Sequence, residues 1–353
     1  MRPLSIAVLG AGNWGTTLAA VAAANGHRTC VWTRDATQAA EIEQRHTNTR
    51  TGLTVTLPEA LRATDQLKQA LQGAELVIAA VPSQAFREVM AKASSYLEPE
   101  HLFVHGTKGL EIGTHARMTQ IVREETCVRQ LGVVAGPNLA TEVSAGLPTA
   151  TVAASPFPRV VEAAKHALSS RRLMVFAAQD VLGVELCGAL KNVVAIAAGM
   201  ADEMQVGENA KAFLVTRGMI ELTRLAFAMG AQPDTMSGLA GIGDLMVTCA
   251  SARSRNHRVG VALAQGQRLD DALKALGMVA EGVYASRSAH ALAKEHRVEL
   301  PLFEHIDRVL HEGLHPKEAL ERLMQLEAGR DVPHLHRPAA TALGPVVGRA
   351  RSA

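Results

Sequence analysis

One charged side chain lies near the middle of a long apolar stretch. The stretch runs from Gly183 to Gly199, and apolar residues, among them Ala and Val, lie on both sides of Lys191. Burial of an ammonium group among such residues is costly unless a partner offsets the charge. Two interpretations fit: Lys191 faces a cleft and acts there, or it extends from a mostly buried helix to reach water. The stretch alone favours neither.

Three glycines near the start, Gly10, Gly12 and Gly15, have the spacing G-x-G-x-x-G. They follow a predicted strand over residues 5–9 and precede a predicted helix over residues 16–25. This context favours a dinucleotide site over an ordinary glycine turn. The first glycine permits a tight turn, the second lets the backbone approach a pyrophosphate, and the third lets helix and strand pack closely.

The end of the second predicted strand bears on the choice between NAD and NADP. An acidic residue there accepts hydrogen bonds from the ribose of NAD, whereas an arginine nearby can hold the 2′-phosphate of NADP. The chain has Thr33-Arg34-Asp35 at this point. Arg34 favours NADPH as the cofactor, and Asp35 beside it keeps NAD open. A solvated loop arginine is the other interpretation of Arg34.

Two more turns follow predicted strands. Lys108 lies between Gly106 and Gly109 after a strand predicted over residues 102–105, and the turn G-P-N-L-A at residues 136–140 follows another strand. In an open α/β sheet, ligands bind at the carboxyl ends of the strands. The placement of Lys108 therefore favours a binding site over a solvated loop.

A second group of candidate residues lies in the C-terminal half. Asp244 ends a glycine-rich turn and is four residues from Thr248, so the two share a face if the segment is helical. Asp244 alone also fits a helix cap. Ser254, Arg255 and Asn256 follow, and an arginine can hold a phosphate through two hydrogen bonds. A solvated charged turn is the alternative for this second cluster.

The histidines and cysteines predict no metal site. His305, His311 and His315 are spaced six and four residues apart, but Gly313 and Pro316 interrupt the second pair, so a surface location is expected. The four cysteines are far apart with no C-x-x-C pair, which favours reduced thiols. The chain has no G-x-S-x-G nucleophile motif.

Composition limits the class of protein. The 353 residues include 36 basic and 34 acidic side chains, a net charge of +2, which argues against nucleic acid as a partner. A hydrophobic share of 48% with only 3% aromatic residues suits helices and parallel strands. The apolar run after Arg2 is interpreted as a buried first strand rather than a signal peptide. No apolar segment approaches about 20 residues, so stable membrane insertion is not expected.

The order of predicted elements divides the chain into three parts. Residues 1–180 alternate strands and helices, which predicts an α/β fold with a Rossmann-type doubly wound parallel sheet that binds the dinucleotide. Residues 181–330 contain long segments with helical periodicity, which predicts an all-α C-terminal domain. Because Lys191 and the second group of candidate residues lie in it, this domain is predicted to serve substrate binding and catalysis. Residues 331–353 are expected to form a flexible tail.

Eight short segments form a set that is far more specific than any one of them. They are G-A-G-N-W-G at 10–15, V-P-S-Q-A-F at 81–86, G-T-K-G-L at 106–110, A-G-L-P-T-A at 145–150, G-A-L-K-N-V-V-A-I-A-A-G-M at 188–200, L-A-G-I-G-D-L at 239–245, S-R-N at 254–256 and V-A-E-G at 279–282. In this order they resemble the bacterial NAD(P)-dependent sn-glycerol-3-phosphate dehydrogenase family.

The resemblance implies reversible, NAD(P)H-dependent reduction of dihydroxyacetone phosphate to sn-glycerol 3-phosphate in the cytoplasm, which supplies phospholipid synthesis. It implies that Lys191 is the catalytic proton donor and acceptor. The predicted substrate-binding residues are Lys108, Gly136, Asn138, Lys191, Asp244, Thr248, Ser254, Arg255 and Asn256. The predicted cofactor-binding residues are Gly10, Gly12, Asn13, Trp14, Gly15, Arg34, Lys108, Ala140, Arg255, Val279 and Glu281.

The chain departs from the family pattern at two places. Asn138 and Leu139 stand where the family often has Ser or Thr and then Phe, and Trp14 replaces a more usual Tyr or Phe. Asn138 can still form hydrogen bonds, and the change at Trp14 is expected to be tolerated. A homodimer through the helical part is compatible with the sequence, although no sequence feature requires one.

Two other functions remain open from the sequence. A β-hydroxyacid dehydrogenase has the same plan, but it typically places Asn four residues after the catalytic Lys, where this chain has Ala195. A non-catalytic dinucleotide sensor needs the glycine turn but not Lys191, Asp244 and Arg255 together.

Overall fold

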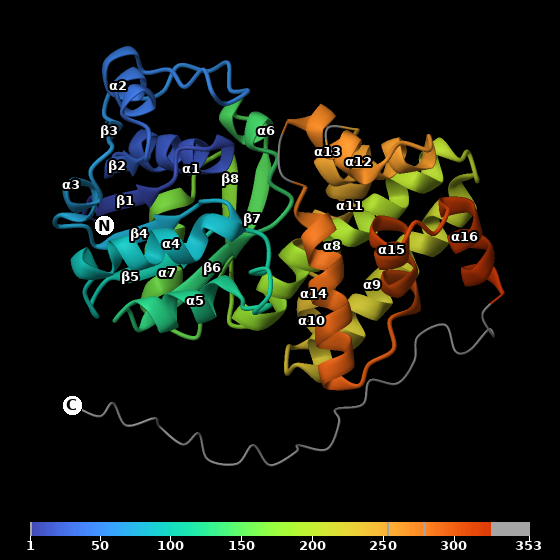
Figure 1. Ribbon diagram of the computed structural model, residues 1–353. Coiled ribbons are helices and arrows are strands. Elements are labelled where there is room, and N and C mark those ends of the chain that lie inside the picture. Colours follow the sequence, from blue (N-terminus) through green and yellow to red (C-terminus); the bar gives the residue numbers. More distant parts are fainter. Residues whose placement is uncertain (1, 253, 278–279, 326–353) are drawn as a thin grey trace, which may run out of the picture.

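Eight strands form one sheet in the N-terminal half of the chain (Figure 1), within the residues that the computed structural model describes, 2–252, 254–277 and 280–325. The strands are β1 (Ser5–Leu9), β2 (Arg28–Trp32), β3 (Arg62–Thr64), β4 (Leu76–Ala79), β5 (Leu102–His105), β6 (Gln130–Ala135), β7 (Thr149–Ala154) and β8 (Leu173–Ala178). Their order across the sheet is β3-β2-β1-β4-β5-β6-β7-β8.

This strand order reverses direction between β1 and β4. The chain builds outward from β1 to β2 and β3, then returns to place β4 on the other side of β1. The connections on the two sides therefore diverge at the carboxyl ends of β1 and β4. In doubly wound sheets a ligand binds at such a reversal.

One strand pair departs from the parallel sheet that the sequence predicts. Strands β6 and β7 are antiparallel, with Val133 opposite Ala154, whereas the other neighbouring pairs are parallel. The connection between them contains only the short helix α6 (Ala140–Ser144). Five helical residues rise about 8 Å, whereas a six-residue strand is about 20 Å long, so this helix cannot return the chain for a parallel crossover.

Helices cover both faces of the sheet because its strands are apolar on both sides. In β1, Ile6 and Val8 pack toward helices α1 and α7, whereas Ala7 and Leu9 pack toward helices α4 and α5. The helices of this half are α1 (Asn13–Ala24), α2 (Ala36–Arg45), α3 (Leu67–Leu71), α4 (Ser83–Ala93), α5 (Met118–Glu125), α6 and α7 (Pro158–Leu168), with a 3-10 turn η1 (Ser94–Tyr96).

The C-terminal half is a bundle built around one central helix, α8 (Val181–Glu203) (Figure 1). By length and composition α8 could cross a membrane, but 89% of its most apolar window is buried inside the protein, as expected for a core helix. The other elements of the bundle are α9 (Glu208–Ala228), α10 (Pro233–Met236), a π-helical turn η2 (Leu239–Gly243), α11 (Asp244–Ala250), α12 (Arg255–Ala264), α13 (Leu269–Leu276), α14 (Glu281–His296), α15 (Pro301–His311) and α16 (Pro316–Met324).

The predicted fold class, a Rossmann-type sheet followed by helices, is confirmed. The sequence did not predict the short strand β3, helix α5, helix α10 or the π-helical turn η2. Strand β8 ends at Ala178 and α8 begins at Val181, and the division into domains at residue 180 stays a prediction. The predicted tail, residues 331–353, lies outside the described residues.

Two glycines bring helices α8 and α12 into backbone contact. A Cβ on Gly199 of α8 would lie 2.0 Å from the carbonyl oxygen of His257, and a Cβ on Gly260 of α12 would lie 2.0 Å from the carbonyl oxygen of Ile196. Both obstacles are backbone atoms, which cannot rotate away as a side chain can. This crossing is therefore possible only without side chains at the two positions.

We expect Gly260→Ala to lower the stability of the protein, because its methyl group must push two buried helices apart. Overpacking of this kind typically costs about 1–3 kcal/mol, which a thermal melt would show as a lower midpoint. Gly52→Ala is the matched control, since a Cβ at Gly52 meets no atom within 4 Å. Equal melting temperatures for the two variants would contradict this account of the crossing.

Candidate active site

The Lys191 side chain is buried, so it does not extend to water. It is 4% exposed in the middle of α8. Its Nζ donates a hydrogen bond to Thr248 Oγ1 at 2.7 Å and forms an ion pair with Asp244. The snorkelling interpretation of Lys191 is therefore wrong, and the buried charge is compensated by a carboxylate from another helix.

The turn that precedes α11 delivers Asp244 to this position. Glycines let η2 pack tightly: a Cβ on Gly241 would lie 2.1 Å from the carbonyl oxygen of Met236. Asp244 is 2% exposed, and no side-chain cap hydrogen bond is present at the start of α11. Thr248, one turn later, donates to the Asp244 carbonyl at 2.6 Å. The carboxylate is thus available for the lysines rather than for capping.

Lys108 reaches the same carboxylate from the sheet. It follows β5, and its Nζ donates to Asp244 Oδ2 at 2.7 Å and to the Gly136 carbonyl at 3.1 Å. The Lys108 side chain keeps 24% of its surface exposed, whereas that of Lys191 keeps 5%. Residues predicted at three separate places in the sequence, Lys108, Lys191 and Asp244, therefore form one cluster where the two halves meet.

Burial and neighbouring charges shift the ionisation of this cluster. Burial lowers the pKa of Lys191 to about 8; the positive charge of Lys108 also lowers this pKa, while Asp244 opposes the shift. For Asp244, burial disfavours the charged form, but the two ammonium groups outweigh it and lower the pKa. The cluster thus holds an ionised carboxylate beside a lysine that can gain or lose a proton near neutral pH.

A second buried carboxylate, Glu185, joins α8 to the sheet. It receives hydrogen bonds from Arg117 Nη1 at 2.5 Å, from the Thr119 backbone N–H at 2.8 Å and from the Thr119 hydroxyl at 2.8 Å, and it lies 3.1 Å from His105 Nε2. Burial disfavours its charge, but these partners lower its pKa to about 2. Sequence reasoning missed Glu185, although a carboxylate in so apolar a helix was the available signal.

The glycine turn has the shape that a dinucleotide requires. Gly10 has φ +109°, and a Cβ there would lie 2.7 Å from the Ala80 carbonyl oxygen at the end of β4. A Cβ on Gly15 would lie 1.9 Å from the Gly10 carbonyl oxygen. At Gly12, by contrast, a Cβ meets nothing within 4 Å. Open space therefore lies beside Gly12 at the N-terminus of α1, as a bound pyrophosphate needs.

Asn13 and Trp14 form the first turn of α1. The indole Nε1 of Trp14 is buried with no hydrogen-bond partner among the described residues. A Cβ on Gly106 would lie 2.6 Å from this atom, so Trp14 packs against the turn that leads to Lys108. An unpaired buried donor between the two turns fits a site that gains a partner when a ligand binds.

The two residues that bear on cofactor choice have different surroundings. Arg34 is exposed. Asp35 caps helix α2 by accepting from the Gln38 backbone N–H at 3.0 Å, and it forms an ion pair with Arg50 at 2.6 Å. The carboxylate of Asp35 is therefore committed to the protein, whereas Arg34 is open to solvent.

Ser83 and Glu281 connect the halves at another point. The Ser83 hydroxyl, at the start of α4, donates to Glu281 Oε2 at 2.7 Å, at the start of α14. Burial raises the pKa of Glu281, and the nearby charge of Arg255 opposes this shift. A Cβ on Gly109 would lie 2.7 Å from Ser83 Cβ and 2.9 Å from Glu281 Oε2, so the absence of a side chain lets the Lys108 turn pass close to this hydrogen bond. Val279, also predicted to bind cofactor, lies outside the described residues.

The predicted phosphate cluster begins helix α12. Ser254 is its N-cap and accepts from the His257 N–H, and Arg255 is the first helical residue and is exposed. Asn256 is buried and donates to Asn192 Oδ1 at 2.9 Å, while it accepts from the Gly282 N–H at 2.9 Å. Asn256 thus links α8, α12 and α14. Sequence reasoning gave Asn192 no role, although it directly follows Lys191.

Asn138 and Ala140 lie in the turn after β6. The Asn138 amide donates to the Ala150 carbonyl at 3.0 Å and accepts from the Thr151 hydroxyl at 2.8 Å, both on β7. Ala140 begins α6, and its carbonyl accepts from Ser144 Oγ at 2.7 Å. The structure therefore gives the Asn138 side chain a part in holding this turn on β7.

The histidines near the C-terminus differ from the expected surface location. His305 is 9% exposed and lies 2.7 Å from the Pro301 carbonyl, and His311 lies 3.1 Å from Ser286 Oγ. Only His315 of the three is exposed, so the surface prediction is wrong for His305. Among the described residues, no group of three or more His, Cys, Asp or Glu side chains could hold a metal ion.

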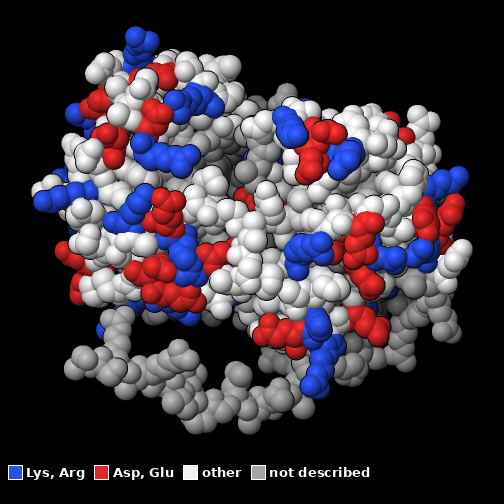
Figure 2. Space-filling view, in the orientation of Figure 1, with Lys and Arg blue, Asp and Glu red and all other residues white. Residues whose placement is uncertain are grey.

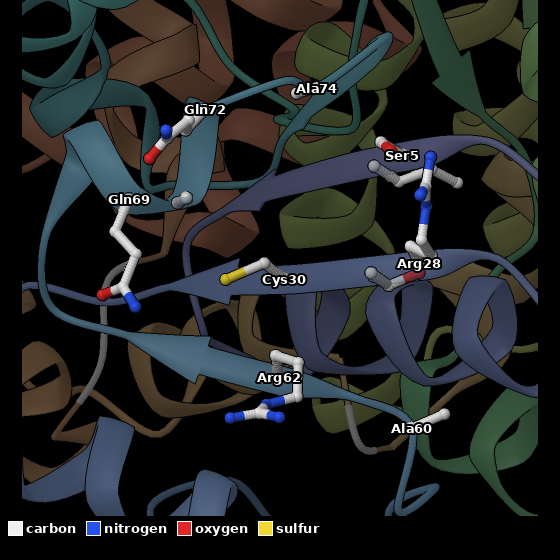
Figure 3. Close-up of a pocket in the computed structure, with 11 residues that line it drawn as sticks. Ser5, Arg28, Cys30, Ala60, Arg62, Gln69, Gln72 and Ala74 are labelled. Carbon is white, nitrogen blue, oxygen red and sulfur yellow. The ribbon is translucent and has the colours of Figure 1, made fainter.

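A pocket of about 320 Å³ lies at the amino ends of strands β1, β2 and β3, on the side of the sheet away from the strands' carboxyl ends (Figure 3). Its lining includes Ser5, Arg28 and Arg62, which begin β1, β2 and β3. Cys30 also lines it, and burial raises the pKa of this thiol to about 11. Because the pocket is at the amino ends of the strands, it is separate from the Lys191 cluster.

Basic and acidic side chains alternate over the face shown in Figure 2, and the surface is indented between the two halves near the top of that view. This face carries no extended basic surface of the kind that binds nucleic acid.

Comparison with known proteins decides the family. Residues 5–161 match the description "NAD-dependent glycerol-3-phosphate dehydrogenase N-terminus", and residues 180–321 match "NAD-dependent glycerol-3-phosphate dehydrogenase C-terminus". The chain belongs to the NAD-dependent glycerol-3-phosphate dehydrogenase family. It is therefore an oxidoreductase that uses NAD or NADP, as the sequence predicted.

Individual relatives support this assignment along nearly the whole chain. Glycerol-3-phosphate dehydrogenase [NAD(P)+] of Geobacillus thermodenitrificans is 44% identical over 91% of this chain and 94% of its own. The enzyme of the same name from Anaeromyxobacter dehalogenans is 45% identical over 91% and 97%. The crystal structure of glycerol-3-phosphate dehydrogenase from Coxiella burnetii superposes with a TM-score of 0.87 at 39% identity, covering 92% of this chain and 99% of that one.

We expect Asp244→Asn to lower the pKa of Lys191 further, by about 1–3 pH units, because the neutral amide no longer favours the ammonium form. An NMR titration of protein labelled on the lysine side chains would measure this change. Asp271→Asn, at an exposed position in the first turn of α13, is the control and should leave the Lys191 titration unchanged. A Lys191 pKa that stays near 8 in Asp244→Asn would contradict the role given to the carboxylate.

Proposed function

We propose that this glycerol-3-phosphate dehydrogenase family member reduces dihydroxyacetone phosphate to sn-glycerol 3-phosphate with NAD(P)H, reversibly, and that Lys191 is its catalytic acid and base. The observation that carries the proposal is the buried cluster in which Asp244 contacts both Lys191 and Lys108. The cluster carries two ammonium groups and one carboxylate. Its remaining positive charge suits a substrate whose carbonyl oxygen becomes negative during reduction.

In the proposed mechanism, Lys191 supplies the proton that the new alcohol requires. When bound, the nicotinamide supplies a hydride to the ketone carbon. The Lys191 ammonium stabilises the growing charge on the carbonyl oxygen and donates its proton there. Lys108 adds a second positive charge and holds the Gly136 turn, while Asp244 keeps both lysines in place. In the reverse reaction the neutral Lys191 amine accepts the proton.

The substrate phosphate would be held at the start of α12. Arg255 and Ser254 lie at this helix N-terminus, and Asn256 follows them. A guanidinium and the helix dipole both favour a phosphate. Because Asn256 also bonds Asn192, which is next to Lys191 on α8, this anchor is fixed relative to the proton donor. Binding of the phosphate would therefore orient the carbonyl toward Lys191.

We further propose NADPH as the preferred cofactor. The commitment of Asp35 to the α2 cap and to Arg50 supports this choice, because a carboxylate so engaged is not free to accept from ribose hydroxyls. The exposed Arg34 is then the group that would hold a 2′-phosphate. We also propose a cytoplasmic enzyme, association as a homodimer through the helices, and use of the product in phospholipid synthesis.

The proposed reaction is tested by following absorbance at 340 nm with dihydroxyacetone phosphate and NADPH or NADH. We expect loss of absorbance for the wild-type protein and a fall in kcat of at least about 100-fold for Lys191→Ala, since general acid catalysis typically contributes that much. Lys274→Ala, on the exposed surface of α13, should keep wild-type turnover. Near-normal turnover in Lys191→Ala would remove Lys191 from the mechanism.

The same assay gives a pH dependence. The pKa of Lys191 is about 8, so the ammonium form that donates the proton is lost as the pH rises through this value. We expect kcat/KM for the reduction to fall above about pH 8, and the reverse oxidation to gain over the same range. A reduction rate that is flat from pH 7 to pH 10 would count against a lysine acid.

Arg34→Ala tests the cofactor preference. Loss of a charged partner for the 2′-phosphate should raise the KM for NADPH by about 10–100-fold, with little change in the KM for NADH. Arg45→Ala, which removes an exposed basic residue from the end of α2, should change neither value. Equal effects of Arg34→Ala on both cofactors would argue against recognition of the 2′-phosphate by this residue.

A further inference from the structure

Two buried amides hold the carbonyl in the middle of the glycine turn. The Ala11 carbonyl oxygen accepts from Gln38 Nε2 at 2.9 Å and from Asn48 Nδ2 at 3.0 Å. Gln38 is 8% exposed and Asn48 is 3% exposed. Gln38 belongs to helix α2 and Asn48 to the loop that follows it. The turn is therefore fixed by side chains that lie 27 and 37 residues further along the chain.

The direction of the Ala11 carbonyl determines the direction of the next N–H. In a planar trans peptide the C=O of one residue and the N–H of the following residue point to opposite sides. Since the Ala11 carbonyl points into the protein toward two amides, the Gly12 N–H points the other way. The space beside Gly12 is open, since a Cβ there would meet no atom within 4 Å. It is also the N-terminus of α1, where a pyrophosphate is expected to bind.

The two amides cannot rotate without loss of hydrogen bonds. Gln38 Nε2 uses its second N–H on Asn48 Oδ1 at 3.0 Å, and Gln38 Oε1 accepts from the Thr33 hydroxyl at 2.6 Å. Asn48 Nδ2 uses its second N–H on Thr16 Oγ1 at 2.9 Å. Both N–H groups of each amide are thus engaged. An amide turned by 180° would place its oxygen against the Ala11 carbonyl oxygen, so this network has one stable arrangement.

We propose that Gln38 and Asn48 are positioning residues for the cofactor pyrophosphate. They hold the peptide between Ala11 and Gly12 so that the Gly12 N–H faces the pyrophosphate. The proposal rests on the dinucleotide binding in the proposed function. Neither side chain touches the cofactor. Their effect on binding comes from orientation of one peptide before the cofactor arrives, so the hydrogen bond to the phosphate costs no reorganisation.

The same network connects the two ends of the cofactor site. Thr33 lies at the end of β2, beside Arg34, and its hydroxyl holds Gln38. The backbone N–H of Gln38 in turn donates to Asp35, the cap of α2. The pyrophosphate end and the ribose end are therefore supported by one residue, Gln38. The pyrophosphate is common to NADH and NADPH, so loss of this support should weaken both cofactors equally.

The test is the affinity for NADH and NADPH without substrate, measured by fluorescence titration of Gln38→Met and Asn48→Leu. Each variant keeps similar volume but removes the donors to Ala11. We expect the Kd to rise by about tenfold for both cofactors, as for loss of a buried hydrogen bond. At saturating cofactor, kcat and the KM for dihydroxyacetone phosphate should stay within about twofold of wild type. A purely structural defect would change these values as well.

Asn25→Leu is the matched control. Asn25 also donates two amide hydrogen bonds to backbone carbonyls, those of Ala167 and Ser169, but it follows the other end of α1. Its cofactor Kd should stay at the wild-type value. The proposal is overturned if the two variants bind both cofactors normally, if Asn25→Leu weakens binding as much, or if only NADPH is affected.

Two further arrangements keep the test decisive. If Gln38→Met or Asn48→Leu melts below the assay temperature, Thr33→Val takes its place. This variant removes the hydrogen bond from Thr33 to the Gln38 amide and should raise the Kd for both cofactors about threefold. Unchanged Kd values would overturn the proposal. Wild-type protein that binds neither dinucleotide would refute the cofactor assignment itself. Binding without turnover of dihydroxyacetone phosphate would refute the proposed reaction and leave the roles of Gln38 and Asn48 to the titrations.

Discussion

The ion pair between Lys191 and Asp244 is the interaction on which the rest of the site depends. An ammonium group in the middle of an apolar core helix is stable only beside a carboxylate, and a buried carboxylate needs positive partners in turn. Asp244 meets both needs by contacting Lys191 from α8 and Lys108 from the sheet. The polar cluster therefore forms only if α8, the π-helical turn and the end of β5 are positioned so that Lys191, Asp244 and Lys108 meet.

This requirement makes the packing of the two halves part of the chemistry. Glu185 fixes α8 on the start of α5 through Arg117 and Thr119, and it lies 3.1 Å from His105 at the end of β5. The Ser83 to Glu281 hydrogen bond joins the halves again beside the Lys108 turn. Each contact buries a carboxylate that would be costly without its partner. Separation of the halves would therefore leave several charges unpaired at once.

The sequence predicted the features that depend on local pattern. Strands β1 and β5 have the expected bounds, because short apolar runs between glycine or polar turns leave little ambiguity. It failed where distant segments decide the outcome. The antiparallel pairing of β7 depends on the length of α6, and the burial of Lys191 depends on Asp244, 53 residues away. The identity of Lys191 as a candidate was predictable, but its environment was not.

The glycine turn shows the same limit at the scale of one peptide. Gly10 and Gly15 mark in the sequence two positions that need φ > 0 or the absence of a side chain, and the structure bears out both, whereas a Cβ on Gly12 would meet no protein atom. They do not state which way the peptide between Ala11 and Gly12 faces, since a glycine permits either orientation. That choice is made by Gln38 and Asn48, two amides that no local motif marks. A flexible turn thus becomes a defined binding surface through hydrogen bonds from a helix and a loop that the sequence places elsewhere.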